Sequence, residues 1–175
     1  MPDLRVEAID SDSLADVYPL VRSGTQVTLE RWIEFGVELL RTGGGVLTIK
    51  APDECVHGVA AYRPGRDLRH KESLEVDVFV AFDLRGDDCI RPALCGALDR
   101  IANELGCKSV NFTVRGRSAD PGSAARAGLE RIGLKLETAQ FVRDLFSADA
   151  MATSRSRGHG EQAGGRAVRP GQTKK

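Results

Sequence analysis

The sequence predicts an α/β protein, more closely an α+β fold with one mixed sheet that is flanked by helices and antiparallel over its first strands. Two observations lead to this prediction. Short runs in which apolar and polar residues alternate, as in half-buried strands, are interspersed with longer stretches of helical periodicity. Three of the strand-like runs also follow one another without a helix between them, over residues 46–80, which is typical of an antiparallel meander.

The first two elements are a strand and a helix. Residues 4–9 alternate apolar and polar side chains, which predicts a half-buried strand. Ser13, with Asp16 three residues later, is typical of a helix start, and apolar residues then recur at helical spacing up to Gly24. We expect Pro19 to limit or kink this helix, because proline removes a backbone donor and its ring clashes with the preceding turn.

A second helix is predicted to begin at Thr28, with Glu30 in its first turn, and to end at Gly43-Gly44-Gly45. Its apolar residues share one side, which we expect to be buried: Leu29, Trp32, Ile33, Val37 and Leu40. The glycine triplet lacks the Lys and the Ser or Thr of a nucleotide-binding loop, and it follows a helix instead of a strand. It therefore predicts a helix cap and a turn.

The next three runs form the predicted meander. Residues 46–50 and 56–62 are β-prone and are joined by a short turn, which predicts an antiparallel hairpin. Residues 74–80 alternate again and predict a third strand. Because side chains two apart on a strand point the same way, Glu75 and Asp77 should lie on one face of it.

The longest helix is predicted over residues 90–105, which follow the 3.6-residue apolar period. Pro92 stands in its first turn, where a missing N–H costs little, and Gly106 ends it. The remaining predicted elements are a strand, a short helix and two strands, over residues 109–114, 123–132, 134–137 and 140–146. The complete predicted order is β-α-α-β-β-β-α-β-α-β-β.

The composition is that of one domain with a polar C-terminal extension. The 175 residues are 41% hydrophobic and 29% charged, which suffices for one core of ordinary size. We expect this domain over residues 1–147 and a disordered, basic, glycine-rich tail over residues 148–175. Residues 151–175 carry six basic residues against one acidic residue, a net charge of +5 that leaves −5 for residues 1–150. The tail has few large apolar side chains to offset the entropy of ordering.

The sequence also narrows the compartment and the metal chemistry. No apolar run approaches the roughly 20 residues that span a bilayer, and the first residues lack the features of a secretory signal, so we expect a cytoplasmic protein without a membrane partner. The four cysteines have no C-x-x-C spacing, and the three histidines do not fall near them at ligand-like intervals, which argues against structural zinc. Such thiols usually serve as small apolar fillers.

Residues 85–90 form the most informative short motif, because they lie between a β-prone run and the longest helix. A turn at a helix N-terminus exposes free N–H groups, which attract a pyrophosphate. Asp87 and Asp88 add negative charge at this point, which works against an anion. The same two residues suit an N-cap and a first-turn acid, so the motif fits either a cofactor cradle or a plain helix cap.

The order of elements, with its landmarks, resembles the GCN5-related N-acetyltransferase (GNAT) fold over residues 4–146. Gly58 lies where the third strand of that family often has a glycine. Residues 78–80 lie where the splayed fourth strand of the family hydrogen-bonds the pantetheine arm of acetyl-CoA. Ala125 and Gly133 fit the late family pattern N-x-x-A-x-x-x-Y-x-x-x-G.

The chain also departs from the family pattern at four positions. The family's phosphate loop, Q/R-x-x-G-x-G/A, falls on residues 85–90, but Asp88 and Ile90 replace the glycine and the small residue that let the backbone approach a pyrophosphate. In the late pattern, Gly122 replaces the Asn. Leu129 replaces the Tyr that many members use as a general acid on the departing thiolate.

The resemblance implies an acyl-CoA-dependent N-acyltransferase that moves an acetyl group from acetyl-CoA, its co-substrate, to a primary amine by direct attack. The amine would belong to a small molecule or a peptide. Such an enzyme holds a thioester carbonyl beside the amine and stabilises the oxyanion with a backbone N–H from the splayed strand. The residues implied in binding the co-substrate are Val78, Phe79, Val80, Arg85, Gly86, Asp87, Asp88, Cys89 and Ile90.

Glu75 and Asp77 are the carboxylates best placed to take the proton from the amine, directly or through water. The simpler alternative is that they form the polar face of a half-exposed strand. His57 and Tyr62 on the neighbouring strand are further candidates, although single residues of these types more often belong to the core or its rim. Cys89 has no base that the sequence places beside it, so a filler role is the simpler reading.

A second hypothesis from another functional class is a non-catalytic GNAT-fold protein that binds acyl-CoA as a sensor or serves as an interaction module. The missing loop glycine and the missing Tyr favour it, whereas Arg85, Gly86 and the long helix favour an enzyme. Binding of nucleic acid through the basic tail ranks below both hypotheses. Edge strands of such sheets often pair across dimers, so a homodimer stays open.

Overall fold

The computed structural model describes residues 4–52, 54–66, 68–69, 71–82 and 89–139. These residues form a five-stranded sheet and five helices. The strands are β1 (Arg5–Ile9), β2 (Gly45–Lys50), β3 (Val56–Gly65), β4 (Ser73–Ala81) and β5 (Ser109–Phe112). The helices are α1 (Tyr18–Thr25), α2 (Leu29–Arg41), α3 (Ile90–Glu104), α4 (Gly116–Ala119) and α5 (Ala124–Arg131). All of these elements belong to one compact unit, residues 1–136.

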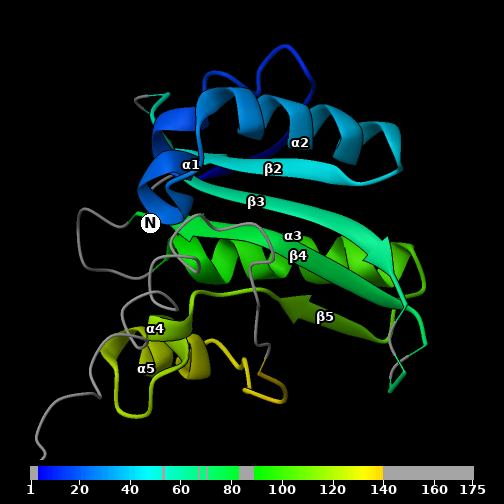
Figure 1. Cartoon of the computed structure of the whole chain (residues 1–175), viewed down its shortest axis with the longest axis vertical. Coiled ribbons are helices and arrows are strands. Elements are labelled where there is room, and N and C mark those ends of the chain that lie inside the picture. Colours follow the sequence, from blue (N-terminus) through cyan, green and yellow to red (C-terminus); the bar gives the residue numbers. More distant parts are fainter. Residues whose placement is uncertain (1–3, 53, 67, 70, 83–88, 140–175) are drawn as a thin grey trace, which may run out of the picture. The chain divides into compact units, whose positions relative to one another are not determined.

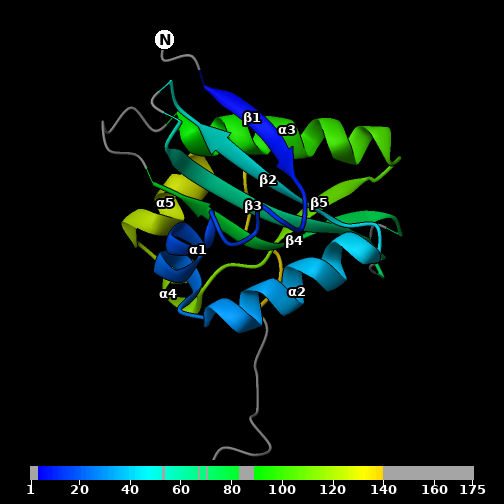
Figure 2. The same cartoon turned by 90° about the horizontal axis from the view of Figure 1, so that it is seen from above.

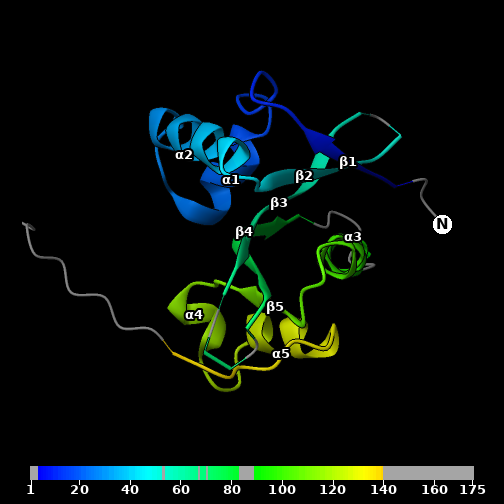
Figure 3. The same cartoon turned by 90° about the vertical axis from the view of Figure 1, so that its right-hand side faces the viewer.

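The sheet has the strand order β1-β2-β3-β4-β5, and its first four strands pair antiparallel. Only β5 is parallel to its neighbour β4, because α3 connects the two strands as a crossover (Figure 1). The predicted meander and the predicted mixed sheet are therefore confirmed. Helices α1 and α2 cover one face of the sheet and α3 covers the other (Figures 2 and 3).

Each face of the sheet has its own apolar core. On the α3 face, Leu94 and Leu98 pack with Ile49 and Val76, and all four are fully buried or nearly so. On the face of α1 and α2, the core is built from Leu14, Val17, Val21, Trp32, Leu39, Val46, Val59, Ala61 and Val78. Alternation along β2 to β4 supplies both cores, since successive side chains point to opposite faces.

The first helix begins later than Ser13, the predicted start. Residues 11–17 form turns, and α1 runs from Tyr18 with Pro19 in its first turn. The hydroxyl and the backbone N–H of Ser13 both donate to Asp10 Oδ1, at 2.9 and 3.1 Å. Ser13 is therefore held in a local turn and does not cap a helix, and the rigid φ of Pro19 fits the first helical turn instead.

Helix α2 begins as predicted, because Thr28 Oγ1 accepts a hydrogen bond from the backbone N–H of Arg31 at 3.3 Å. Its predicted buried side was wrong in part. Leu29 and Val37 are exposed, and the buried residues are Trp32, Gly36 and Leu39. Gly36 shifts the buried side, since a Cβ there would lie 2.7 Å from Leu14 Cδ1 and the helix packs against Leu14 at this point.

The later elements follow the prediction less closely. Ser123 caps α5 with its hydroxyl, and Gly133 follows the helix with a φ of +89°, as the sequence predicts. The strand predicted over residues 134–137 is wrong, since these residues are described and form no strand, and Leu136 is exposed. The short helix α4 was not predicted. The strand predicted over residues 140–146 and the tail lie outside the described residues.

No helix in the part of the chain that the structure describes is long and apolar enough to cross a membrane.

Candidate active site

Strand β4 is paired on both sides over only part of its length. Its ladder with β5 joins residues 73–76 to residues 109–112, and the backbone N–H of Thr113 adds a last bond to the Val76 carbonyl at 2.9 Å. Beyond this point β5 ends, whereas β4 continues to Ala81 along β3 (Figure 1). Among the described residues, the second half of β4 therefore has a strand on one side only.

The backbone groups on this open edge can be assigned from the pairing with β3. The Phe82 N–H donates to the His57 carbonyl at 2.8 Å, which marks the pair as hydrogen-bonded. Because backbone groups alternate along a strand, Val80 also points its N–H and C=O toward β3. Phe79 and Ala81 therefore point theirs to the open edge, where an extended substrate chain can pair with them.

A β-bulge lies where the open edge begins. On β4, Val76 is opposite Tyr62 and Val78 is opposite Ala61, so Asp77 is the extra residue. A bulge of this kind bends the strand, increases its twist and re-aims the side chain of the extra residue. Without the bulge, unbroken alternation from Val76 would place Val78 on the α3 face, whereas Val78 packs into the core under α1 and α2.

Asp77 is a partly buried carboxylate with one cationic neighbour. Its Oδ2 lies 3.1 Å from Arg63 Nε, an ion pair whose geometry falls short of a hydrogen bond, and this oxygen is buried without a hydrogen bond to any described residue. Burial raises the pKa of Asp77, and the charge of Glu75 adds to this effect, while Arg63 opposes it. A partly buried carboxylate with a raised pKa accepts a proton more readily than one that is fully exposed to water, which keeps Asp77 a candidate for the base.

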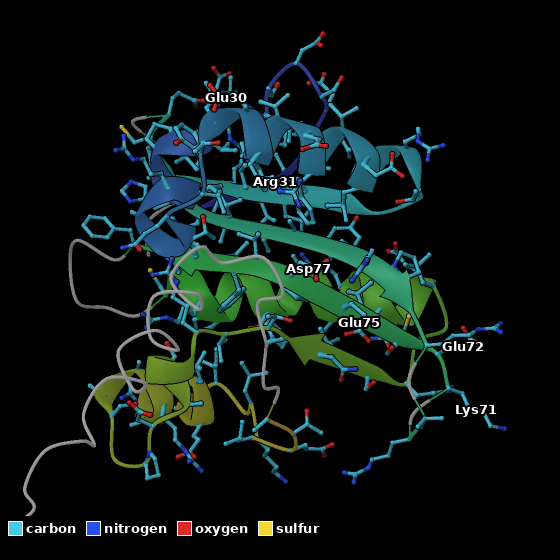
Figure 4. The ribbon with its side chains drawn as sticks, in the orientation of Figure 1. Glu30, Arg31, Lys71, Glu72, Glu75 and Asp77 are labelled. Carbon is cyan, nitrogen blue, oxygen red and sulfur yellow. The ribbon has the colours of Figure 1, made fainter. Side chains whose placement is uncertain are left out.

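Glu75 is held in place by neutral donors. Its Oε1 accepts hydrogen bonds from Ser73 Oγ at 2.6 Å and from Asn111 Nδ2 at 3.0 Å. Figure 4 shows Glu75 and Asp77 close together on β4, apart from Lys71 and Glu72 at the start of the strand. The structure thus brings the two predicted carboxylates together, and it fixes Glu75 more firmly than Asp77.

The side chains of residues 78–80 do not line the open edge. Val78 and Val80 pack into the core under α1 and α2, and Phe79 packs into the core under α3, edge-on to Phe112 at 5.0 Å between ring centroids. Gly24 of α1 lies so close to Val80 that a Cβ on it would approach Val80 Cγ2 to 2.3 Å. Any ligand at this edge is therefore held by backbone groups.

The start of α3 rests on Gly58 of β3. A Cβ on Gly58 would lie 2.9 Å from both Ile90 Cγ2 and Leu94 Cδ1, so glycine allows this close approach. Ile90 is only 4% exposed, which places the bulky side chain of the altered loop motif in the core. Cys89 precedes the helix and packs against the same core, in agreement with a filler role. Residues 85–88 of the motif lie outside the described residues.

Of the remaining candidates, Tyr62 lies opposite the bulge on β3, next to Asp77 along the ladder. Tyr62 packs against the core of the α3 face, and burial, with the charge of Glu104, raises its pKa. His57 pairs with Phe82, at the other end of the open half of β4. Leu129, at the position of the missing Tyr, is partly buried in α5. No group of three His, Cys, Asp or Glu within the described ranges could hold a metal ion.

Three residues of the site were not predicted from the sequence: Arg63, Ser73 and Asn111. Their signal lies in strand pairing, because Arg63 and Asn111 are the partners of Glu75 on β3 and β5. Counting back from the hairpin turn could have identified Arg63. The partner on β5 depends on a crossover through α3, whose register no local pattern fixes.

Comparison with known proteins finds similar folds among solved structures. No family model and no curated protein sequence matches the chain. Among solved structures, the aminoglycoside N-acetyltransferase AAC(6')-Iy in complex with CoA has a TM-score of 0.68 at 13% identity, over 83% of this chain and 97% of that one. Ribosomal-protein-alanine N-acetyltransferase from Brucella melitensis has a TM-score of 0.63 at 16% identity, over 81% and 99%.

A third similar structure is a GNAT family acetyltransferase from Staphylococcus aureus, with a TM-score of 0.58 at 11% identity over 83% of this chain and 100% of that one. At such low identities the similarity shows the fold. The predicted resemblance in fold is therefore confirmed over most of the chain.

Proposed function

We propose that this chain, whose fold is that of the GNAT acetyltransferases, transfers an acetyl group from acetyl-CoA to a primary amine. The observation that carries the proposal is the open edge of β4, which starts beside the partly buried carboxylate of Asp77. An extended pantetheine arm can pair with the backbone of Phe79 and Ala81, as one more strand would. The thioester carbonyl would then lie at the bulge, beside Asp77.

The reaction needs one base and one oxyanion donor. Asp77 accepts a proton from the ammonium form of the acceptor, directly or through water, and the free amine attacks the thioester carbonyl. A carbon–nitrogen bond forms while the negative charge on the carbonyl oxygen is stabilised by a backbone N–H of β4, for which Phe79 is the candidate. The carbon–sulfur bond then breaks, and the second amine proton leaves with the CoA thiol, giving an amide and CoA.

The charge of the site favours a cationic acceptor. Two carboxylates, Glu75 and Asp77, lie on β4, and Arg63 is the cation next to them among the described residues. A protonated amine approaching Asp77 is attracted by this arrangement. Two of the similar structures are named for amine-bearing acceptors, an aminoglycoside and a ribosomal-protein alanine. For this chain, the acceptor is proposed to be a small molecule or a peptide with a primary amine.

The first experiment measures binding and turnover separately. Acetyl-CoA at millimolar concentration is expected to raise the thermal unfolding temperature, because a ligand that binds only the folded state stabilises it. Release of the CoA thiol is then followed with a panel of amines, including polyamines, aminoglycosides and short peptides. No thermal shift and no calorimetric heat would contradict every acyl-CoA function for this chain.

The second experiment tests Asp77. Asp77→Asn removes the base while keeping the shape of the side chain, and it is expected to lower kcat about 10²–10⁴-fold with little change in acetyl-CoA affinity. Glu72→Gln is the matched control, because Glu72 lies on the same hairpin in an exposed ion pair with Arg66 at 3.2 Å. Equal activity of Asp77→Asn and the wild type would exclude Asp77 as the base.

A sensor that binds acyl-CoA without turnover is the second candidate. Asp88 in the loop motif and Leu129 at the position of the general acid favour it. It predicts a thermal shift with acetyl-CoA and no thiol release with any amine. Asp88→Gly serves both hypotheses, since removing a negative charge from a loop that holds pyrophosphate should tighten CoA binding. Unchanged affinity in this variant would mean that the pyrophosphate binds elsewhere.

A further inference from the structure

We propose that Arg63 of β3 is the positioning residue of this site, and that it holds the Asp77 carboxylate charged and oriented to accept the amine proton. The proposal rests on the function proposed above and adds to it a residue that neither the loop motif nor the late pattern contains. It follows from three features of the structure: the strand pairing, the exposure of the pair and the set of charges around Asp77.

The strand pairing brings the two side chains together. Arg63 is the direct partner of Glu75 on the neighbouring strand, so in a regular ladder it would face Glu75. The bulge adds Asp77 one pair further along β4, next to the pair of Tyr62 and Val76, and Arg63 Nε lies 3.1 Å from Asp77 Oδ2. The hydrogen bonds of Glu75 come from Ser73 and Asn111 instead. The guanidinium is therefore directed to Asp77.

The exposed fractions of the two side chains allow Arg63 to move away from Asp77 and to return. The Asp77 side chain is 24% exposed and that of Arg63 is 55% exposed, so the pair is open to solvent mainly on the arginine side. A half-exposed guanidinium can shift when a cationic amine approaches the same carboxylate. A fully buried pair could not exchange partners in this way, because an uncompensated charge would remain in the core.

Among the described residues, Arg63 is the cation that acts on Asp77, and no second cation opposes the effect of burial. Glu75 on β4 is the other charged group that acts on Asp77, and it disfavours the carboxylate form, as burial does. Residues 109–112 of β5, which run alongside this part of the sheet, carry no charge. The charged residues of α1 and α2 are exposed. Without Arg63, the two remaining influences, burial and Glu75, both raise the pKa of Asp77, and its protonated form cannot serve as a base.

Removing Arg63 should shift the pH dependence of the proposed reaction to higher pH. A general base must be unprotonated, so activity rises with pH through the pKa of Asp77. Removing Arg63 removes what holds this pKa down, and the acidic limb of the pH profile for kcat/KM should move to higher pH. Loss of a purely structural contact would lower activity at all pH values without moving the limb.

The test titrates Asp77 directly in protein that carries ¹³C-labelled aspartate. In Arg63→Gln, the pKa of Asp77 should rise by about one unit relative to the wild type, the low end of the effect of a close opposite charge. Arg63→Lys keeps a cation and should restore most of the shift. Arg66→Gln is the matched control on the same hairpin, because Arg66 pairs with exposed Glu72, and it should leave the titration unchanged.

An Asp77 titration that is the same in Arg63→Gln and the wild type overturns the proposal, as does an equal shift in Arg66→Gln. The titration needs no turnover, so it decides the role of Arg63 even if no amine is acetylated. Absence of thiol release with every amine would instead contradict the proposed function. A moved titration together with an unmoved acidic limb would show that Arg63 sets the charge of Asp77 but that Asp77 is not the base.

Discussion

Replacing Gly58 with alanine should destabilise the protein and displace the start of α3. The added Cβ would lie 2.9 Å from Ile90 Cγ2 and from Leu94 Cδ1, whereas carbon atoms in good contact are about 3.5–4.0 Å apart. The helix or both side chains must therefore move by roughly 0.6 Å or more to make room. Overpacking of this kind costs about 1–3 kcal/mol.

Part of this cost is offset in the unfolded chain. Alanine has less backbone freedom than glycine, which favours folding by about 0.4–1 kcal/mol. The net loss is therefore about 1.3 kcal/mol when the midpoints of the two ranges are subtracted, about 2 minus about 0.7 kcal/mol. For a domain of this size it corresponds to a fall in Tm of roughly 3–6 °C. The start of α3 would move, and with it any CoA contact that the proposed function places there, so CoA should bind several-fold more weakly.

The assay is thermal unfolding by circular dichroism, with calorimetric titration of CoA. Gly96→Ala is the matched control in α3, because a Cβ there meets only Arg100 Nη1 at 3.9 Å and should raise stability by about 0.5–1 kcal/mol. If Gly58→Ala unfolds at the temperature of the wild type and binds CoA equally well, the reasoning that ties Gly58 to the placement of α3 is refuted.

Three further predictions test the core and the thiols. Thr48 is fully buried and its hydroxyl makes no hydrogen bond with a described residue. Thr48→Val should therefore leave the free energy of unfolding in urea unchanged or raise it by about 1 kcal/mol, and a clear loss of stability would reveal a hydrogen-bond partner of the hydroxyl. Trp32→Phe removes the hydrogen bond that Nε1 donates to the Leu14 carbonyl at 2.7 Å. The free energy of unfolding, followed by circular dichroism, should fall by about 2–4 kcal/mol, and a fall below about 1 kcal/mol would contradict a structural role for this bond. Burial, with the charge of Asp99, raises the pKa of Cys95 to about 11. Iodoacetamide at pH 8 should therefore modify exposed Cys55 before Cys95, and the reverse order in mass spectrometry would contradict the burial of Cys95.

The sequence predicts most elements because their signals are local. Alternation marks β1 and β4, β-prone runs joined by a turn mark β2 and β3, and the 3.6-residue period marks α3. The errors arise where a tertiary contact decides. Asp10 holds Ser13 in a turn, so the helix start that Ser13 resembles does not form. Gly36 lies against Leu14, so the buried side of α2 differs from the most apolar one.

The site could be predicted only in part. Glu75 and Asp77 are recognisable as carboxylates of one strand, but the bulge that makes Asp77 the extra residue is defined by the partner strand. Its one trace in the sequence is the apolar run of residues 78–80, where alternation stops. Arg63 is visible only once the β3 register is known. The strand predicted over residues 134–137 does not form, and no described strand lies in position to pair with these residues.

Amide hydrogen exchange along β4 tests the central claim most directly. In the free protein, the amides of Phe79 and Ala81 should exchange quickly because they point to the open edge, whereas that of Val80 should be protected by its pairing with β3. Acetyl-CoA should slow exchange at Phe79 and Ala81 and leave the outer strand β1 unchanged. If acetyl-CoA binds and these two amides exchange as before, the co-substrate does not lie along β4, and the proposed site is wrong.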